Sequence, residues 1–374
     1  MKNNRLLIQS IKSYLSASQI NRSGKRVSEK LVIIESDDWG AIRTPSKEAL
    51  KAFHKRGLDI GNSIYKVDAL ESQTDLELLF EVLSKHKGSD GKPAKMTANA
   101  IMANPDFDKI RESNFTEFHY ERFTDTFNKY PEHANNLSLW KQGMEDQIFQ
   151  PQFHGREHLN YKRWLRVLRS QNEAAHFCFN WGATYSGVAD YSFMEAYDWD
   201  SPTDIPEQLQ VLEEGLNIFK ETLGFASKSF IAPCYNWDPK IEPLLKEHGV
   251  KWLQGIRSQL IPTGTFDHYS PLKHYFGEHN ALGLKYNVRN CVFEPSMNPD
   301  RDWVNSCMAQ IASAFHWHKP AVICSHRINF VGYIDEKNRD RGLKDLNFLL
   351  KAIVKKWPEV QFISTDELDA FDLK

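Results

Sequence analysis

The sequence feature that most constrains the fold is an apolar run that leads directly into two carboxylates, within residues 31–40. Leu31 to Ile34 are four consecutive apolar residues, three of them β-branched, and they predict a strand buried on both faces. Adjacent carboxylates at the end of a strand repel each other unless a cation or a proton lies between them. Asp37 and Asp38 therefore indicate a metal site with one carboxylate free for acid–base chemistry, while a solvated turn closed by Gly40 is the simpler alternative.

Composition narrows the class of protein. The chain has 374 residues, enough for one large domain or two ordinary ones, and its hydrophobic content of 41% is enough for a full core. A formal net charge of -2 gives no electrostatic case for nucleic acid or an anionic membrane as a partner. The five cysteines show no C-x-x-C spacing, which favours a reducing compartment over a disulfide framework. Because no secretory segment and no apolar run of the ~18 residues of a membrane span is visible, we expect a cytoplasmic protein.

Apolar strand patterns and amphipathic helix patterns alternate along the chain. The predicted strands are 31–36, 96–102, 148–153, 229–232, 250–256, 286–293, 321–325 and 360–363. The predicted helices are 47–56, 75–86, 156–170, 205–223, 239–248, 300–315 and 339–356, after a helical segment within residues 1–30. Residues 105–146 and 171–205 show no clear period and are interpreted as insertions. The alternation predicts a single α/β domain over residues 1–374, a parallel barrel-like sheet with two insertions.

Polar side chains stand at the ends of five of the predicted strands. They are Asp37-Asp38, His154 with His158, Tyr235-Asn236, Arg289-Asn290 and His326-Arg327. Sites in parallel α/β architectures assemble at the carboxyl ends of the strands, so this distribution favours an enzyme.

The two histidines four residues apart are candidate metal ligands. If the segment is helical, His154 and His158 project from one face and can share a cation, although the same spacing also occurs in purely structural pairs. Two histidines and one aspartate make a set of three protein ligands, which leaves positions open for water and substrate. Zn²⁺ fits this nitrogen-rich set best, and Co²⁺, Mn²⁺, Ni²⁺ and Fe²⁺ are compatible with the same ligand types.

Together these motifs resemble the polysaccharide deacetylases, a family that includes chitin and peptidoglycan N-acetylglucosamine deacetylases. The likeness spans roughly residues 31–330, and its motifs are Asp37-Asp38, His154-Gly155-Arg156-Glu157-His158, Ala232-Pro233-Cys234-Tyr235 and Ile323-Cys324-Ser325-His326. The resemblance implies a distorted (β/α) barrel, usually of seven strands, with a divalent metal as cofactor and a carbohydrate as substrate.

The resemblance also implies a role for each matching residue. Asp37 is the expected general base that activates the attacking water, and His326 is the expected general acid that protonates the leaving amine. The implied metal ligands are Asp38, His154 and His158. Apart from the resemblance, the expected substrate contacts are Trp39, Tyr235 and Arg289, where Trp39, which departs from the family's first motif, either stacks on a sugar ring or fills the rim of the barrel. A backbone N–H near Cys234 or Tyr235 would help to hold the oxyanion.

The chain departs from the family pattern at positions that support catalysis. Gly155 stands where the family usually has Ser or Thr, which removes a hydroxyl beside the first histidine. Ile231 stands where the family usually has the arginine that orients the catalytic aspartate. Arg43, Arg289 or Arg327 could supply that guanidinium, and the sequence does not choose between them.

The expected function is a metal-dependent hydrolase that removes the N-acetyl or O-acetyl group of a sugar in a polysaccharide or glycan precursor. One alternative is a non-catalytic carbohydrate-binding or metal-binding relic of the fold, which Gly155 and Ile231 favour. The other is a glycoside hydrolase on a related barrel, in which the carboxylates would flank a glycosidic bond instead of a metal.

Overall fold

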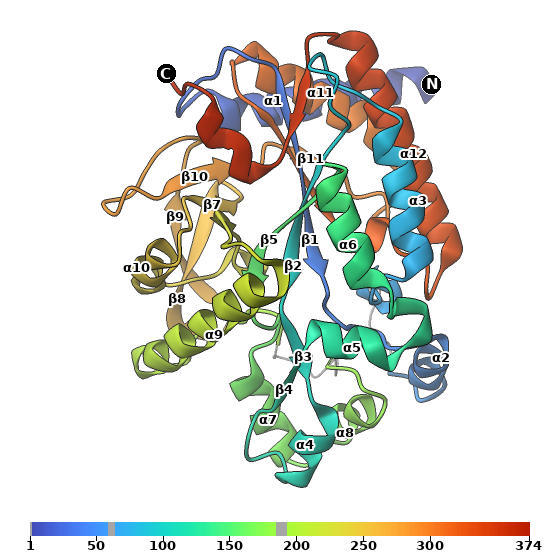
Figure 1. Cartoon of the computed structure of the whole chain (residues 1–374), viewed down its shortest axis with the longest axis vertical. Helices are drawn as coiled ribbons and strands as arrows, with labels where there is room; N and C mark the ends of the chain where they lie inside the picture. The colour runs from blue at the N-terminus through green and yellow to red at the C-terminus, as the bar shows by residue number, and fades with distance from the viewer. Residues whose placement is uncertain (1, 59–63, 185–192) are drawn as a thin grey trace.

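The centre of the molecule is a parallel sheet of nine strands with helices packed around it, seen in the computed structural model of the chain (Figure 1). The structure describes residues 2–58, 64–184 and 193–374, with side chains from residue 11 onward. Along the sheet the strand order is β10-β7-β6-β5-β2-β1-β12-β11, and β13 also pairs with β1. The fold is therefore an α/β barrel-like fold, as the alternation of patterns predicted.

The strands of this sheet match the predicted ones closely. They are β1 (Leu31–Trp39), β2 (Met96–Ile101), β5 (Phe149–Gly155), β6 (Ser229–Phe230), β7 (Trp252–Gly255), β10 (Lys285–Val288), β11 (Cys291–Val292), β12 (Ala321–His326) and β13 (Gln361–Ile363). The strand predicted at 286–293 is divided into β10 and β11, which lie at opposite ends of the strand order.

The main helices also begin and end near their predicted limits. They are α1 (Lys2–Asn21), α2 (Lys47–Lys55), α3 (Gln73–Ser84), α7 (Tyr161–Arg169), α9 (Ile205–Leu223), α10 (Glu242–Glu247), α11 (Trp303–His316) and α12 (Glu336–Lys356). Ser46 caps α2 by accepting a hydrogen bond from the backbone N–H of Ala49. Gly224 ends α9 in the left-handed conformation that favours glycine.

The interior of the barrel is polar around Glu35, and contacts across it show how strongly the sheet curves. Strands β1 and β10 are separated by four other strands in the sheet order. Even so, Asn287 of β10 donates a hydrogen bond of 2.7 Å to Glu35 of β1. Thr365, after β13, donates to the same carboxylate at 2.7 Å. Leu31 and Ile33 lie on the same face of β1 as Glu35 and pack with Trp252 and Val322, whereas Val32 and Ile34 join the main apolar core on the other face.

The segment 105–146, interpreted from the sequence as an insertion without a clear period, contains several short elements together with the strand that leads into it. They are β3 (Ala103–Pro105), α4 (Phe107–Glu112), β4 (Tyr120–Arg122), α5 (Phe123–Lys129) and α6 (Asn136–Glu145), with β3 antiparallel to β4. Helices of six to ten residues make too few turns for a 3.6-residue period to be visible in the sequence. The second insertion, 171–205, contains α8 (Glu173–Asn180), and its residues 185–192 lie outside the described part of the chain.

The antiparallel hairpin of β8 (Ser258–Thr265) and β9 (His268–Lys273) was not predicted. Short 3₁₀ turns complete the fold: η1 (Ile64–Val67), η2 (Pro131–His133), η3 (Pro202–Asp204), η4 (Pro233–Tyr235), η5 (Pro239–Ile241), η6 (Arg327–Asn329) and η7 (Thr365–Ala370). Among the described helices, none combines the length and the apolar character needed to cross a bilayer.

Candidate metal centre

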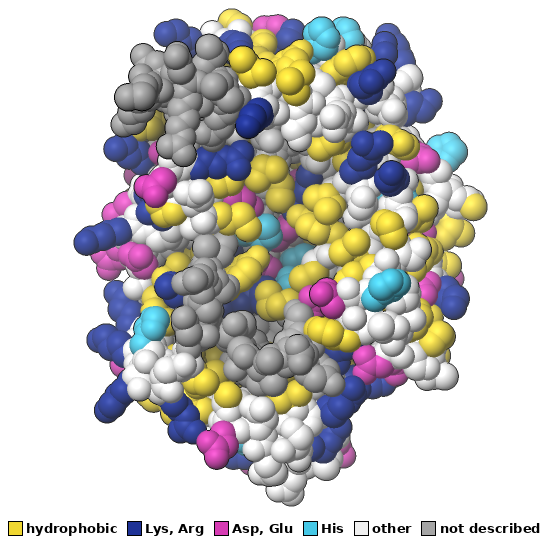
Figure 2. Space-filling view, turned by 180° about the vertical axis from the view of Figure 1, so that it is seen from behind, with side chains coloured by type: hydrophobic (Ala, Val, Ile, Leu, Met, Phe, Trp, Pro, Cys, Tyr) yellow, Lys and Arg dark blue, Asp and Glu magenta, His cyan; other side chains and the backbone are white. Residues whose placement is uncertain are grey.

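A cleft at the carboxyl ends of the barrel strands collects most of the predicted site residues. Its charged lining includes the ends of β1 and β12 together with the segment that follows β5. Figure 2 shows this face of the molecule, with histidine and acidic side chains gathered in a hollow near its centre. The apolar part of the lining includes Met194, Val292 and Met297.

Three of the predicted ligands lie together in this cleft. Asp38 Oδ1 is 3.6 Å from His154 Nε2 and 3.3 Å from His158 Nε2. One donor atom from each residue lies within 4.8 Å of the other two. This is the mutual distance expected of atoms that share one ion with bonds of about 2.0–2.2 Å.

The helical placement of the two histidines was wrong. His154 lies within β5, and His158 lies in the connection before α7, which begins only at Tyr161. Gly155 has a φ of 137°, a backbone conformation that residues other than glycine rarely adopt, and the chain turns there. The turn, not a helical period, brings the second imidazole back to within 5.1 Å of the first, centroid to centroid.

The donor set fits a divalent ion. The Nδ1–H of His154 donates a hydrogen bond of 2.9 Å to the backbone carbonyl of Ile231, which leaves Nε2 as the nitrogen with a lone pair. This Nε2 is buried and has no hydrogen-bond partner among the described residues. Burial, together with the nearby Arg43 guanidinium, lowers the pKa of His158 well below its usual value, so the imidazole is neutral as a ligand must be.

Arg289 supplies the guanidinium that Ile231 cannot. Its Nη1 donates to Asp37 Oδ2 at 2.7 Å and its Nη2 to Asp37 Oδ1 at 2.6 Å. Burial works to raise the pKa of Asp37, but the Arg289 charge and hydrogen bonds hold this pKa well below its ordinary value. Arg289 is 3% exposed and its Nε is bound to Glu35 at 2.7 Å. The prediction that Arg289 contacts substrate is therefore wrong, because all of its nitrogens are used inside the barrel.

His326 is oriented by Glu294, a residue that the sequence analysis did not single out. The Nδ1–H of His326 donates to Glu294 Oε1 at 2.6 Å, and Nε2 lies 3.8 Å from Asp37 Oδ2. Although burial opposes it, the carboxylates of Glu294 and Asp37 raise the pKa of His326 well above its ordinary value. Glu294 directly follows the predicted strand 286–293, so its position at a strand end was an available signal.

Of the other two predicted substrate contacts, Trp39 lies in the core and Tyr235 lies in the cleft. Trp39 is 1% exposed, its ring lies edge-on to Phe149 at 5.1 Å, and its Nε1 donates to Ser36. It fills the barrel rim, and the prediction of a contact with a sugar ring is wrong because the ring does not reach the cleft. Tyr235 does line the cleft, where its hydroxyl accepts a hydrogen bond of 3.1 Å from Arg289.

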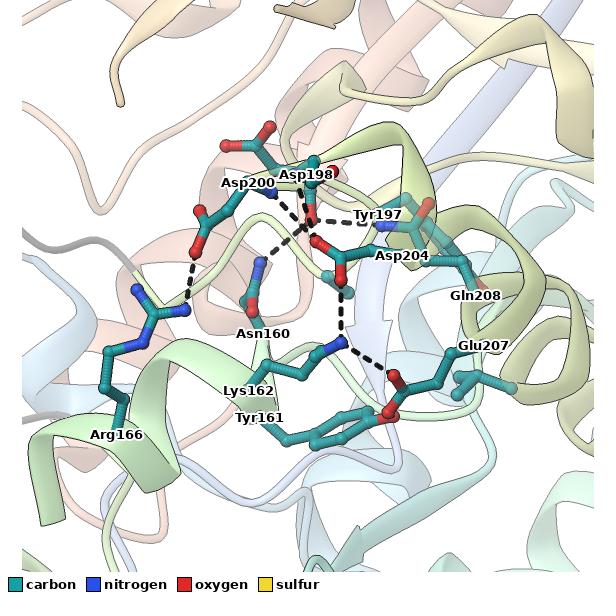
Figure 3. A pocket seen from close by; sticks show the side chains of 13 residues that line it. Asn160, Tyr161, Lys162, Arg166, Tyr197, Asp198, Asp200, Asp204, Glu207 and Gln208 are labelled. Carbon is teal, nitrogen blue, oxygen red and sulfur yellow. Dashed lines mark hydrogen bonds and ion pairs between the residues drawn. The ribbon is translucent and has the colours of Figure 1, made fainter. Parts of the chain in front are cut away.

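A separate pocket lies beside the connection that carries His158. Asn160, Lys162 and Gln208 are among its lining residues, and Figure 3 shows their contacts. Lys162 is paired with Asp204 and Glu207, each at 2.7 Å. Lys162 is thus held by two carboxylates of the pocket itself, and we assign the pocket no part in the reaction.

Comparison with known proteins gives distant structural likenesses only. No protein-family model matches the chain, and no curated protein matches it. A 4-alpha-glucanotransferase from Thermococcus litoralis is similar at 11% identity and a TM-score of 0.47, over 92% of this chain and 41% of that one. A candidate polysaccharide deacetylase from Mycobacterium smegmatis is similar at 10% identity and a TM-score of 0.41, over 93% of this chain and 90% of that one.

A GH57-type branching enzyme from Pyrococcus horikoshii is similar at 13% identity and a TM-score of 0.39, over 91% of this chain and 70% of that one. The chain spans 41% of the length of the glucanotransferase. At these identities and TM-scores the likenesses assign no activity to the chain.

Proposed function

We propose that the protein is a metal-dependent hydrolase that removes an acetyl group from an N-acetylated sugar in a glycan or glycan precursor. The observation that carries the proposal is the meeting of Asp38, His154 and His158 at one point, beside a carboxylate and an imidazole that are each fixed by an ion pair. A divalent ion held by these three residues, with Zn²⁺ the best fit, would polarise the acetyl carbonyl and lower the pKa of a water.

The chain's own residues supply the proton transfers. Asp37 is charged because Arg289 holds its pKa low, and it accepts a proton from the attacking water. The water oxygen forms a bond to the acetyl carbon and the carbon–nitrogen bond breaks, which yields acetate and a free amine. His326 is protonated because Glu294 and Asp37 raise its pKa, and it can donate from Nε2 to the departing nitrogen.

The glycoside hydrolase alternative needs two carboxyl groups that can approach a glycosidic bond. Asp37 accepts from both terminal nitrogens of Arg289, and Asp38 faces two imidazoles and Arg43. Glu294 is bound by His326 and by Asn329, the latter at 2.7 Å. What supports the deacetylase over the glycoside hydrolase is that Asp38 lies with two imidazoles in a ligand arrangement, which the hydrolysis of a glycosidic bond by two carboxyl groups does not require.

The relic alternative relied on Ile231, which replaces the family arginine, and on Gly155. Arg289 makes the two-point contact with Asp37 that the family arginine is expected to make, so Ile231 no longer argues against activity.

Acetate release tests the proposal. The purified full chain is incubated with chitooligosaccharides of defined length, with and without a chelator, and then with Zn²⁺ or Co²⁺ added back. We expect acetate and free amine in equal amounts, loss of both with chelator, and recovery with metal. New reducing ends without acetate would instead establish a glycoside hydrolase, and bound metal without any turnover would favour the relic.

A further inference from the structure

We propose that Arg43 competes with the divalent ion for Asp38, and that its guanidinium transfers to Asp68 when the ion binds. The inference rests on the metal centre of the proposed function and concerns how strongly that centre holds its ion. Arg43 Nη2 lies 3.1 Å from Asp38 Oδ1. This is the same oxygen that faces the Nε2 atoms of both His154 and His158.

The competition is electrostatic and takes place where water screens little. Arg43 is 8% exposed and Asp38 is 2% exposed. A guanidinium bound to the ligand oxygen places a positive charge next to the ion, and repulsion between two cations is stronger in a buried site than in water. An ion bound by the three ligands must therefore share Asp38 with Arg43 or displace it.

Asp68 is positioned to receive the displaced guanidinium. Its Oδ2 lies 3.5 Å from Arg43 Nε, and neither atom has a hydrogen-bond partner among the described residues. Asp68 is fully buried, and its Oδ1 is held by Arg327 at 3.0 Å. A buried carboxylate oxygen without a hydrogen bond is costly, so a small movement of Arg43 toward Asp68 gains a partner for both atoms.

Apart from the two aspartates, Arg43 contacts the Met194 thioether and the Tyr65 ring, whose centroid lies 5.7 Å from the guanidinium carbon, and neither contact is with a carboxylate. Its Nη1 donates to the thioether sulfur of Met194, and a thioether is a weak acceptor. Arg289, the other arginine at the site, differs in this respect because carboxylates accept from all three of its nitrogens. Arg43 is thus the arginine whose contacts can be exchanged, which makes it a positioning residue for the metal ligand.

Metal affinity measures the proposal directly and does not depend on turnover. The full chain, the single variants Arg43→Gln, Asp68→Asn and Glu71→Gln, and the double variant that combines Arg43→Gln with Asp68→Asn are stripped of metal and titrated with Zn²⁺ against a chromophoric chelator. We expect Arg43→Gln to bind Zn²⁺ roughly tenfold more tightly and Asp68→Asn roughly tenfold more weakly. The double variant should behave like Arg43→Gln, because Asp68 acts through Arg43.

Glu71→Gln is the matched control. Glu71 pairs with Arg327 at 3.1 Å, as Asp68 does at 3.0 Å, but within the described part of the chain it forms no ion pair with Arg43. Its loss should leave the Zn²⁺ affinity unchanged.

The outcomes separate this inference from the proposed function. A wild-type chain that binds no Zn²⁺ would remove the metal centre and the proposed function together. A wild-type chain that binds Zn²⁺, with Arg43→Gln equal or weaker, would overturn only the competition. Circular dichroism shows whether each variant is folded, and Asp68→Asn tests the proposal separately if Arg43→Gln fails to fold, because its predicted effect has the opposite sign.

Discussion

Arg289 forms a bidentate ion pair with Asp37 inside the barrel, in which Nη1 and Nη2 donate to the two carboxylate oxygens at 2.7 and 2.6 Å. Asp37 lies in β1, whereas Arg289 directly follows β10, a strand separated from β1 by four others in the sheet order. The curvature of the sheet is therefore what brings the guanidinium to the aspartate. Glu35, two residues before Asp37, holds the other edge of the same guanidinium at 2.7 Å. The buried guanidinium is stable there because carboxylates accept hydrogen bonds along two of its edges.

Replacing Arg289 by lysine keeps the charge and loses the two-point geometry. An ammonium group offers donors from a single nitrogen and cannot hold both oxygens of Asp37 in the plane of the carboxylate. We expect kcat for acetate release to fall at least about 100-fold, while the bound Zn²⁺ per chain stays at the wild-type value. Steady-state kinetics and elemental analysis measure the two quantities. Loss of metal in Arg289→Lys would show that this arginine supports the ligand set instead of the base.

The metal content of two variants should distinguish the general base from a metal ligand. Asp37→Asn removes the general base but no ligand, so we expect turnover to fall roughly 100- to 10,000-fold with metal retained. His154→Ala removes a ligand, so both metal and turnover should be lost. Elemental analysis of dialysed protein gives the metal content. Equal loss of metal in the two variants would mean that the roles of Asp37 and Asp38 are assigned wrongly.

The sequence predicted the strands correctly where the local pattern of apolar residues matches their burial in the fold. The strands at 31–36 and 321–325 are buried on both faces, so their apolar runs are unambiguous. The ends of the same strands carry Asp37, Asp38 and His326, and parallel strands place such residues at one edge. That these residues gather at one edge could therefore be predicted from strand order, whereas the choice of ligands among them rested on the family resemblance.

The remaining parts depend on contacts that no local pattern encodes. The partner of Asp37 could not be chosen among three arginines, because the choice depends on how far the sheet curls. The placement of His158 depends on the backbone turn at Gly155, and four-residue spacing suggested a helix instead. Trp39 is a large ring beside the site, and only its packing against Phe149 shows that it belongs to the core.

The buried position of Trp39 predicts an effect on stability and not on substrate binding. Trp39→Phe should lower the free energy of unfolding by about 1–3 kcal/mol, because it removes buried ring atoms and the hydrogen bond to Ser36. The KM for chitooligosaccharides should be unchanged. Urea unfolding and steady-state kinetics make the comparison. Trp181→Phe, at a position 39% exposed, is the control and should be close to neutral in stability. A raised KM without lost stability would restore the role of Trp39 in sugar binding.

The ion pair between Glu294 and His326 sets the alkaline limit of activity. His326 acts in its protonated form, so the rate falls as the pH rises through its pKa. Glu294 raises this pKa, so Glu294→Gln should lower it and move the alkaline limb of the kcat/KM profile to lower pH. Glu242→Gln is the control, since Glu242 binds Trp237 and Asn280 instead. An unmoved alkaline limb in Glu294→Gln would mean that His326 is not the acid.

Stability at mildly acidic pH should depend on His274, which lies outside the site. Its ring stacks on Tyr286 with centroids 3.6 Å apart, and its Nε2 lies 2.8 Å from Gln259 Oε1. Burial lowers its pKa from 6.5 to about 4. The unfolded chain therefore binds a proton between these values that the folded chain does not. The contribution to stability is complete above pH 6.5 and falls as the pH drops, by at most about 3 kcal/mol near pH 4.

Urea unfolding across this pH range measures the effect. His274→Gln cannot be protonated, so its free energy of unfolding should fall less steeply between about pH 6.5 and about pH 4 than that of the wild type. His268→Gln changes an exposed histidine in the neighbouring hairpin and should keep the wild-type slope. Equal slopes in His274→Gln and the wild type would show that the buried ring does not control acid stability. The reason is that only a group with different proton affinity in the folded and unfolded chains can tie stability to pH.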